Sequence, residues 1–172
     1  GIITKAKGGN ATGEDGDGGA GIASDGTLTI HSGNIETAQG GTSTNGNGGS
    51  GIYSNRELKI DGNAAITNAT GGDSTDGNGG YGIRSSNMLT ISDNAAITNA
   101  TSIDGTGGNG IFSDGKLSIE KATITNATGG DADSGTGGSG IRSDGEFAIY
   151  GSTITNATGG DATGESGTGG SG

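Results

Sequence analysis

The sequence predicts an all-β fold, a parallel β-helix (β-solenoid), because one pattern of about 30 residues recurs five times along its 172 residues. Each copy opens on a Gly-Ile pair, and the copies start at Gly21, Gly51, Gly82, Gly110 and Gly140. A fixed period of this length is typical of solenoids, propellers and arrays. Apolar side chains hold fixed places in every copy, which favours an ordered repeat over a disordered glycine-rich chain.

Each copy predicts three short strands. In the first copy Ile22 is followed by Leu28 and Ile30, and the alternation of apolar and polar residues there predicts a strand with one buried face. The third strand carries Ile35 and Ala38, and the other copies repeat this pair with the same spacing. A WD-type propeller, which needs four strands per repeat, and an RTX β-roll, which has a nonapeptide period, both fit poorly.

The turns and loops absorb all differences in length between the copies. Asp-Gly pairs such as Asp25-Gly26, which tolerate positive φ, separate the first two strands. Insertions fall only in the turn before the third strand and in the Gly-rich loop after it, which is shortest at Ser102-Ile103-Asp104-Gly105. A stacked coil predicts this confinement of length changes to turns.

Stacking of equivalent residues is the expected source of order. Coils would rise by about 4.8 Å each, so that five coils make a rod of roughly 24 Å. We expect residues 1–172 to be a single solenoid segment, with a partial coil over 1–19 and coils starting near 20, 50, 81, 109 and 139. An inward serine column, with shared hydrogen bonds, would comprise Ser24, Ser54, Ser85, Ser113 and Ser143. An asparagine column would form an amide ladder from Asn68, Asn99, Asn126 and Asn156.

The composition argues against several classes of function. The net charge of −11 argues against nucleic acid and anionic membrane surfaces as partners, and no apolar run approaches the ~18 residues of a membrane span. The single histidine, His31, has no catalytic motif around it, and no phosphate-binding loop opens a helix. We therefore expect no enzymatic activity.

Acidic loops supply the candidate metal ligands. Carboxylates on alternate or near-alternate residues, with Gly for tight turning, suit Ca²⁺. The candidate residues are Asp15, Asp17, Asp73, Asp76, Asp131 and Asp133. The alternative is that these carboxylates are solvated turn residues that aid solubility. Structural Ca²⁺ is the one cofactor that the sequence suggests.

Three outward columns suggest ligands or modification. Tyr53, Arg84, Phe112 and Arg142 would present aromatic rings about 9–10 Å apart, a spacing suited to stacking of sugar rings, or they would satisfy one another by cation–π contact. The threonine rows at 67, 98, 125 and 155 and at 70, 101, 128 and 158 are similar, by analogy, to those of ice-binding proteins, although β-propensity also explains them. The Asn-Ala-Thr sequons at Asn68, Asn99, Asn126 and Asn156 predict N-linked glycans unless the ladder occupies these amides.

The repeat motif resembles those of a known class of proteins. Gly-Ile-x-Ser-Asp-Gly-x-Leu-x-Ile, present over 140–149 with Phe147 as the Leu, is followed by a Thr/Ile strand and a Gly-rich loop. In this repeat motif, nearly the whole chain resembles bacterial cell-surface parallel β-helix proteins, including those described as carbohydrate-binding domains. The resemblance implies a secreted, non-catalytic surface protein. The long Gly-rich loops depart from the pattern of that class.

Together these features predict a non-catalytic extracellular structural protein, a surface spacer or fibre-building repeat. Open coil ends near Ile3 and Ile154 would expose strand edges and invite end-to-end pairing with another copy, or with a longer array of the same repeats. The alternatives are an adhesin-type module that binds polysaccharide and an ice-binding solenoid.

Overall fold

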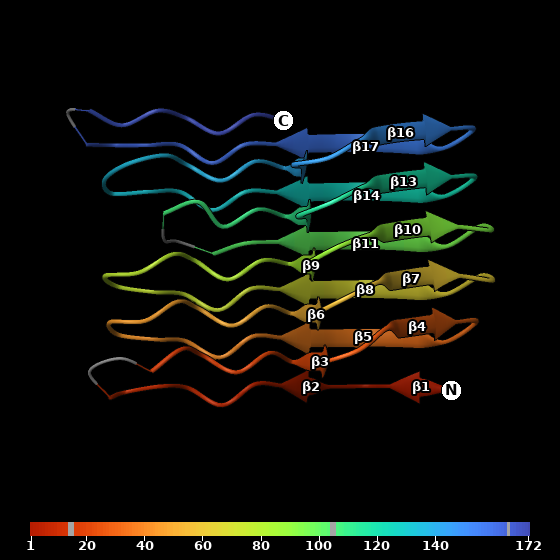
Figure 1. Ribbon diagram of the computed structural model, residues 1–172, viewed down its shortest axis with the longest axis horizontal. Helices are drawn as coiled ribbons and strands as arrows, with labels where there is room; N and C mark the ends of the chain where they lie inside the picture. The colour runs from red at the N-terminus through yellow and green to blue at the C-terminus, as the bar shows by residue number, and fades with distance from the viewer. Residues whose placement is uncertain (14–15, 104–105, 165) are drawn as a thin grey trace.

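The computed structural model describes residues 1–13, 16–103, 106–164 and 166–172, and it is a parallel β-solenoid of stacked coils (Figure 1). Two of its sheets have five strands and the third has seven, and every neighbouring pair is parallel. The described part of the chain contains no helix, and so none long and apolar enough to cross a membrane. The predicted fold class is confirmed.

Each coil adds one strand to each of three sheets. The first sheet contains β3 (Ile22–Ser24), β6 (Ile52–Ser54), β9 (Ile83–Ser85), β12 (Ile111–Ser113) and β15 (Ile141–Ser143). The second contains β4 (Leu28–His31), β7 (Leu58–Asp61), β10 (Leu89–Ser92), β13 (Leu117–Glu120) and β16 (Phe147–Tyr150). The third contains β1 (Ile2–Ile3), β2 (Ala6–Lys7), β5 (Asn34–Gln39), β8 (Ala65–Thr70), β11 (Ala96–Thr101), β14 (Thr123–Thr128) and β17 (Thr153–Thr158).

The strand register places like residues on like. Ile52 pairs with Ile83, and Ile83 pairs in turn with Ile111. The same holds for the second sheet, where Ile60 pairs with Ile91. The predicted self-stacking of the chain is therefore correct.

The core is made of these isoleucine and leucine columns together with alanine. The isoleucines of the first sheet in the three inner coils, Ile52, Ile83 and Ile111, have no exposed surface. Alanine fills a second inward position, in the turn before the third strand, at Ala64, Ala95 and Ala122. The sequence does not predict this turn alanine as core, because it lies outside the alternating strand pattern.

The Asp-Gly turns differ from expectation. Residues 25–26, 114–115 and 144–145 do not have positive φ. Instead, the serine that ends each strand of the first sheet turns inward and bonds the main chain. Ser54 Oγ lies 2.8 Å from Gly26 O and 2.9 Å from Glu57 O, so these two carbonyls share its single hydroxyl hydrogen. The serine column thus points inward as predicted, but its hydroxyls bond main-chain carbonyls rather than one another. Because serine holds the turn without a positive φ, Arg56 fits where three of the other copies have Gly.

Positive φ occurs instead in the turn between the second and third sheets. One residue per coil takes the left-handed conformation there, and these residues are Ser32, Gly62, Asp93, Lys121 and Gly151, with φ of 51°, 59°, 55°, 51° and 57°. Asn63 and Asn94, in the two copies with an inserted residue, add a second such position with φ of 64°. Asn tolerates this conformation better than most residues, which explains how the insertion is accommodated.

The Gly-rich loop is an ordered layer rather than an irregular connection. Each loop leaves the third sheet and returns to the first as two extended legs, visible on the left of Figure 1. Main-chain hydrogen bonds join the legs in a zigzag: Gly41 N donates to Gly19 O, Gly49 N to Gly41 O, and Gly72 N to Gly49 O, at 2.7–2.8 Å. We name this layer the glycine zigzag.

Candidate functional site

The outward column of the first sheet forms one connected cluster. Tyr53, Arg84, Phe112 and Arg142 lie on successive strands in direct register. The Arg84 guanidinium carbon is 5.9 Å from the ring centroid of Tyr53 and 5.8 Å from that of Phe112, and Arg142 is 5.7 Å from Phe112. The predicted alternative, in which these side chains satisfy one another by cation–π contact, is what the structure shows.

Tyr81 belongs to this cluster and was missed from the sequence. Its ring stacks on Phe112 with centroids 5.1 Å apart and an angle of 14° between the planes. Phe112 is only 5% exposed, and burial raises the pKa of the Tyr81 phenol. The available signal was the position before each Gly-Ile, which holds small or polar residues in the other copies but Tyr in the third.

A groove of about 500 Å³ lies beside this cluster. Its lining includes Tyr53, Tyr81, Arg84, Asn47, Asn78 and Asp17, with the return legs of the glycine zigzag between them. Asn47 Nδ2 donates to Asp17 Oδ1 at 3.2 Å, and Asn78 Nδ2 donates to Asn47 Oδ1 at 3.0 Å, so a polar ladder forms one wall. Of the predicted sugar-stacking residues, Tyr53 and Arg84 line this groove; sugar binding by the set stays a prediction.

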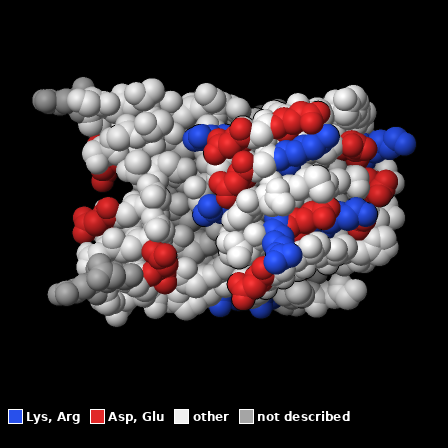
Figure 2. All heavy atoms as spheres, viewed as in Figure 1, with Lys and Arg blue, Asp and Glu red and all other residues white. Residues whose placement is uncertain are grey.

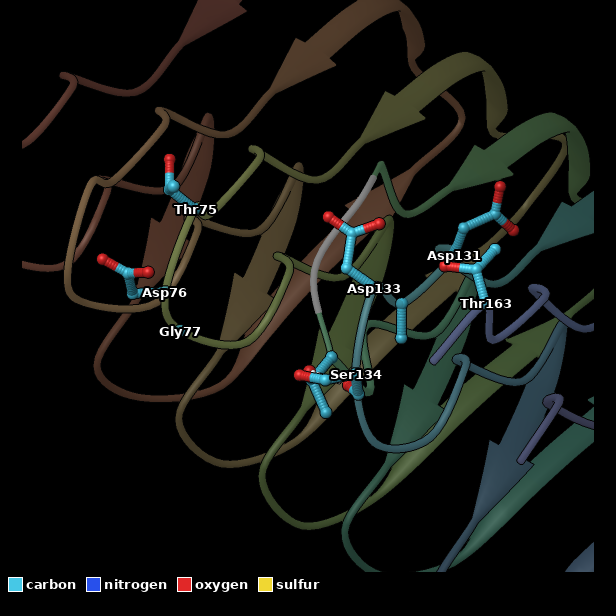
Figure 3. Close-up of a pocket in the computed structure, with 9 residues that line it drawn as sticks. Thr75, Asp76, Gly77, Asp131, Asp133, Ser134 and Thr163 are labelled. Atoms are coloured by element: carbon cyan, nitrogen blue, oxygen red, sulfur yellow. Dashed lines mark hydrogen bonds between the residues drawn. The ribbon is translucent and has the colours of Figure 1, made fainter. Parts of the chain in front are cut away.

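A second hollow, of about 270 Å³, interrupts the loop edge where the loop is shortest. Figure 2 shows this indentation at the left edge of the molecule, with carboxylates above and below it. Asp76, Asp131 and Asp133 line it together with threonines of neighbouring coils. In Figure 3 Asp76 lies on the loop of a different coil from Asp131 and Asp133, and the carboxylates of these two point apart. The three carboxylates therefore do not converge on one point.

The predicted calcium ligands therefore divide into separate places. Asp17 Oδ1 accepts the main-chain N–H of Asn47 at 2.6 Å, and Asp131 Oδ1 accepts that of Asp161 at 2.8 Å. Asp73 lies half-buried in the loop that also carries Asp76, and Asp15 lies outside the described residues. Within the described ranges no three His, Cys, Asp or Glu side chains are close enough to hold one metal ion. Calcium binding stays a prediction.

The asparagine column is an amide ladder, as predicted. Asn99 Nδ2 donates to Asn68 Oδ1 at 2.9 Å, Asn126 to Asn99 at 2.9 Å, and Asn156 to Asn126 at 2.8 Å. Asn68 Nδ2, at the foot of the ladder, donates to the Glu36 carbonyl at 3.3 Å. The amide nitrogen of each predicted sequon thus has an acceptor, and use of these sequons stays a prediction.

Asn99→Asp is expected to destabilise the fold by about 1–3 kcal/mol at pH 7, because a carboxylate cannot donate to Asn68 Oδ1 and leaves that oxygen facing a charge. Below about pH 4 the introduced carboxyl group is protonated and regains a donor, so the loss should shrink as the pH falls. Urea unfolding followed by circular dichroism at pH 7 and pH 3.5 measures both effects. The matched control is Asn45→Asp in an exposed loop; an equal loss in the control would contradict a role for the ladder.

A smaller ionic cluster links the first two coils on the second sheet. Asp61 is buried and accepts from Lys59 Nζ at 2.7 Å and from His31 Nδ1 at 2.7 Å. The hydrogen bond from Lys59, followed by that from His31, lowers the pKa of the Asp61 carboxyl, and Asp61 raises the pKa of Lys59. The hydrogen bond between His31 and Asp61 joins neighbouring coils.

The two threonine rows differ in their surroundings. Thr70, Thr101, Thr128 and Thr158 pair in direct register along the third sheet. In the other row, Thr98 falls between the paired residues Ile97 and Asn99 and is exposed. The asparagine ladder lies between the two rows, and ice binding stays a prediction.

The end coils expose side chains that inner coils bury. Ile3 is 42% exposed at one end, and Phe147 and Ile149 are each 46% exposed at the other, whereas their equivalents in the inner coils are buried.

The resemblance to cell-surface β-helix proteins stays a prediction. Comparison with protein-family models, with curated proteins and with solved structures found no match to this chain.

Proposed function

We propose that the chain is a non-catalytic extracellular structural protein, a surface spacer or fibre-building β-solenoid whose coils add end to end. The observation that carries this proposal is that successive coils pair their strands in one shared register. β12 pairs with β15, β13 with β16 and β14 with β17 in the register that the earlier coils also use. A further coil of the same sequence finds the same partners at the end of the rod.

The surfaces at the ends support the same proposal. Phe147 and Ile149 continue the inner columns of the second sheet, but no coil covers them within these 172 residues. Their strand also presents main-chain N–H and C=O groups along a free edge, which pairs readily with another strand. A coil from the same chain or from another copy would bury both.

End-to-end association is tested by sedimentation velocity and electron microscopy over increasing protein concentration. We expect the native chain to form rods, and Ile149→Asp to prevent them, because a buried unpaired carboxylate opposes docking of a coil on that end. Thr67→Asp is the matched control, since it adds the same charge to an exposed lateral position and should leave rods unchanged. Monomers at every concentration, with folded protein by circular dichroism, would overturn the proposal.

A further inference from the structure

The loops of this chain contain four Asn-Gly pairs, which are Asn45-Gly46, Asn47-Gly48, Asn78-Gly79 and Asn109-Gly110. In such a pair the main-chain nitrogen of glycine can attack the side-chain amide carbon of the asparagine before it, because glycine has no side chain to crowd that nitrogen. All four pairs share this chemistry, so the surroundings that the fold gives each pair decide which of them reacts.

Hydrogen bonds restrain three of the four pairs. A glycine N–H that donates to an acceptor must break that bond before its nitrogen can attack. The bonds are those from Gly46 N to Ser43 Oγ at 2.9 Å, from Gly48 N to Asn78 O at 2.9 Å and from Gly110 N to Ser139 O at 3.0 Å. Asn109 is also buried, and its Oδ1 accepts the N–H of Ser139 at 2.7 Å.

The remaining pair lies where the ladder of main-chain hydrogen bonds is interrupted. The equivalent N–H in four other coils donates to the coil that follows, at 2.8–3.0 Å, from Gly18, Gly48, Gly107 and Gly137. Among the described residues, none accepts the N–H of Gly79. The coil that follows Gly79 has the shortest loop, and Gly107 in it takes a φ of 76°, whereas its equivalents in the other coils do not have positive φ.

The side chain of Asn78 is the last amide of its own ladder. Its Nδ2 donates to Asn47 Oδ1 at 3.0 Å, but the next coil has Thr106 in the equivalent place. The Thr106 hydroxyl donates to Ser134 O at 2.9 Å rather than to Asn78. Asn78 is exposed, and both Asn78 and Gly79 line the groove of about 500 Å³, so water reaches this pair.

From these contacts we propose that Asn78-Gly79 is a site of spontaneous deamidation, which converts Asn78 to aspartate and isoaspartate. Gly79 N forms a bond to Asn78 Cγ, the bond from Cγ to Nδ2 breaks, and the N–H proton leaves with Nδ2 as ammonia. Water then adds to one of the two carbonyl carbons of the cyclic imide, and the bond from that carbon to Gly79 N breaks as the nitrogen takes up a proton. Opening at Cγ gives aspartate, and opening at the main-chain carbonyl carbon gives isoaspartate.

Both products change the wall of the groove. A carboxylate at position 78 cannot donate to Asn47 Oδ1, so the upper bond of the polar ladder is lost. Isoaspartate also adds a carbon atom to the main chain just before Gly80. That leg of the glycine zigzag is closely packed, since a Cβ at Gly80 would overlap the carbonyl of Gly49. We therefore expect the modification to loosen the contact between these two coils locally.

The test is the rate of conversion at each pair in the folded chain, kept in mildly alkaline buffer and then digested with trypsin. Peptide 60–84 contains Asn78 in its only Asn-Gly pair, and peptide 8–56 contains Asn45 and Asn47. Mass spectrometry with fragmentation locates each new carboxyl group, and chromatography separates aspartate from isoaspartate peptides. Asn78 should convert about tenfold faster than Asn47, because the bonded N–H of Gly48 reacts only after local opening.

The same chain in concentrated urea is the matched control. Unfolding removes the hydrogen bonds, so Asn45, Asn47 and Asn78 should then convert at similar rates. Conversion of Asn45 or Asn47 as fast as that of Asn78 in the folded chain would overturn the assignment. An Asn78 that stays unmodified in the folded chain, while the unfolded chain reacts, would overturn it as well.

Discussion

Gly72→Ala should cost at least about 3 kcal/mol of the free energy of unfolding, and it should prevent folding of the coils around it. A Cβ at Gly72 would overlap the carbonyl of Gly41 in the coil below. The new Cβ meets main-chain atoms, so no side-chain rotation relieves the overlap. Separating the two legs would break the hydrogen bonds from Gly72 N to Gly49 O and from Gly80 N to Gly72 O. Urea unfolding followed by circular dichroism measures the loss.

Gly9→Ala is the matched control, because Gly9 holds the same place in the Gly-Gly pair of the partial coil over residues 1–19. A Cβ there meets nothing within 4 Å, since no coil lies below it. The two substitutions make the same change in composition and in unfolded-state entropy at equivalent positions of two repeats. If Gly9→Ala were as costly as Gly72→Ala, close packing of the glycine zigzag would not explain the effect.

Ile97→Ala should cost about 2–5 kcal/mol, because it opens a cavity in the middle of the rod. Ile97 is 1% exposed and lies between Ile66 and Ile124 in the third-sheet column, so its neighbours cannot collapse without breaking their register. Thermal and urea unfolding of the variant measure the loss. We expect the whole rod to lose stability, since each coil is the template for the next.

Ile154→Ala makes the same change in the last coil and should cost clearly less. Ile154 has a partner on one side only, Ile124, and is partly exposed. A difference between the two variants measures what stacking on the second side contributes. Equal losses would mean that isoleucine stabilises each coil separately rather than through the column.

The alternating residues were sufficient to predict the strands and the stacking. Ile83 and Leu89 lie where the period places them, and each pairs with its equivalent in the next coil. The asparagine ladder followed from the same logic, because identical amides above one another can donate and accept in a chain. The inward direction of the serine side chains was predicted correctly. Their hydrogen-bond acceptors were not, because the carbonyls of the turn lie closer to each hydroxyl than the hydroxyl of the next coil does.

The parts that could not be predicted depend on contacts between backbones or on single departures from the repeat. Glycine has no side chain to show which way it faces, so the sequence predicts the zigzag only as an ordinary loop. Tyr81 occurs in one copy only, and a prediction based on columns does not weigh a residue without equivalents. The acidic loops show that closeness in sequence does not bring side chains together: Asp131 and Asp133 are near in sequence, yet their carboxylates point apart (Figure 3).

The shared register has a consequence for how such a gene can change. Recombination between misaligned copies of the repeat would add or remove one coil of about 4.8 Å, and every new contact would already exist elsewhere in the molecule. Rod length can therefore vary in whole steps without a round of compensating substitutions. A substitution at a single position of a column, by contrast, disturbs the contacts with the equivalent residues above and below it. Selection against this loss keeps the copies alike.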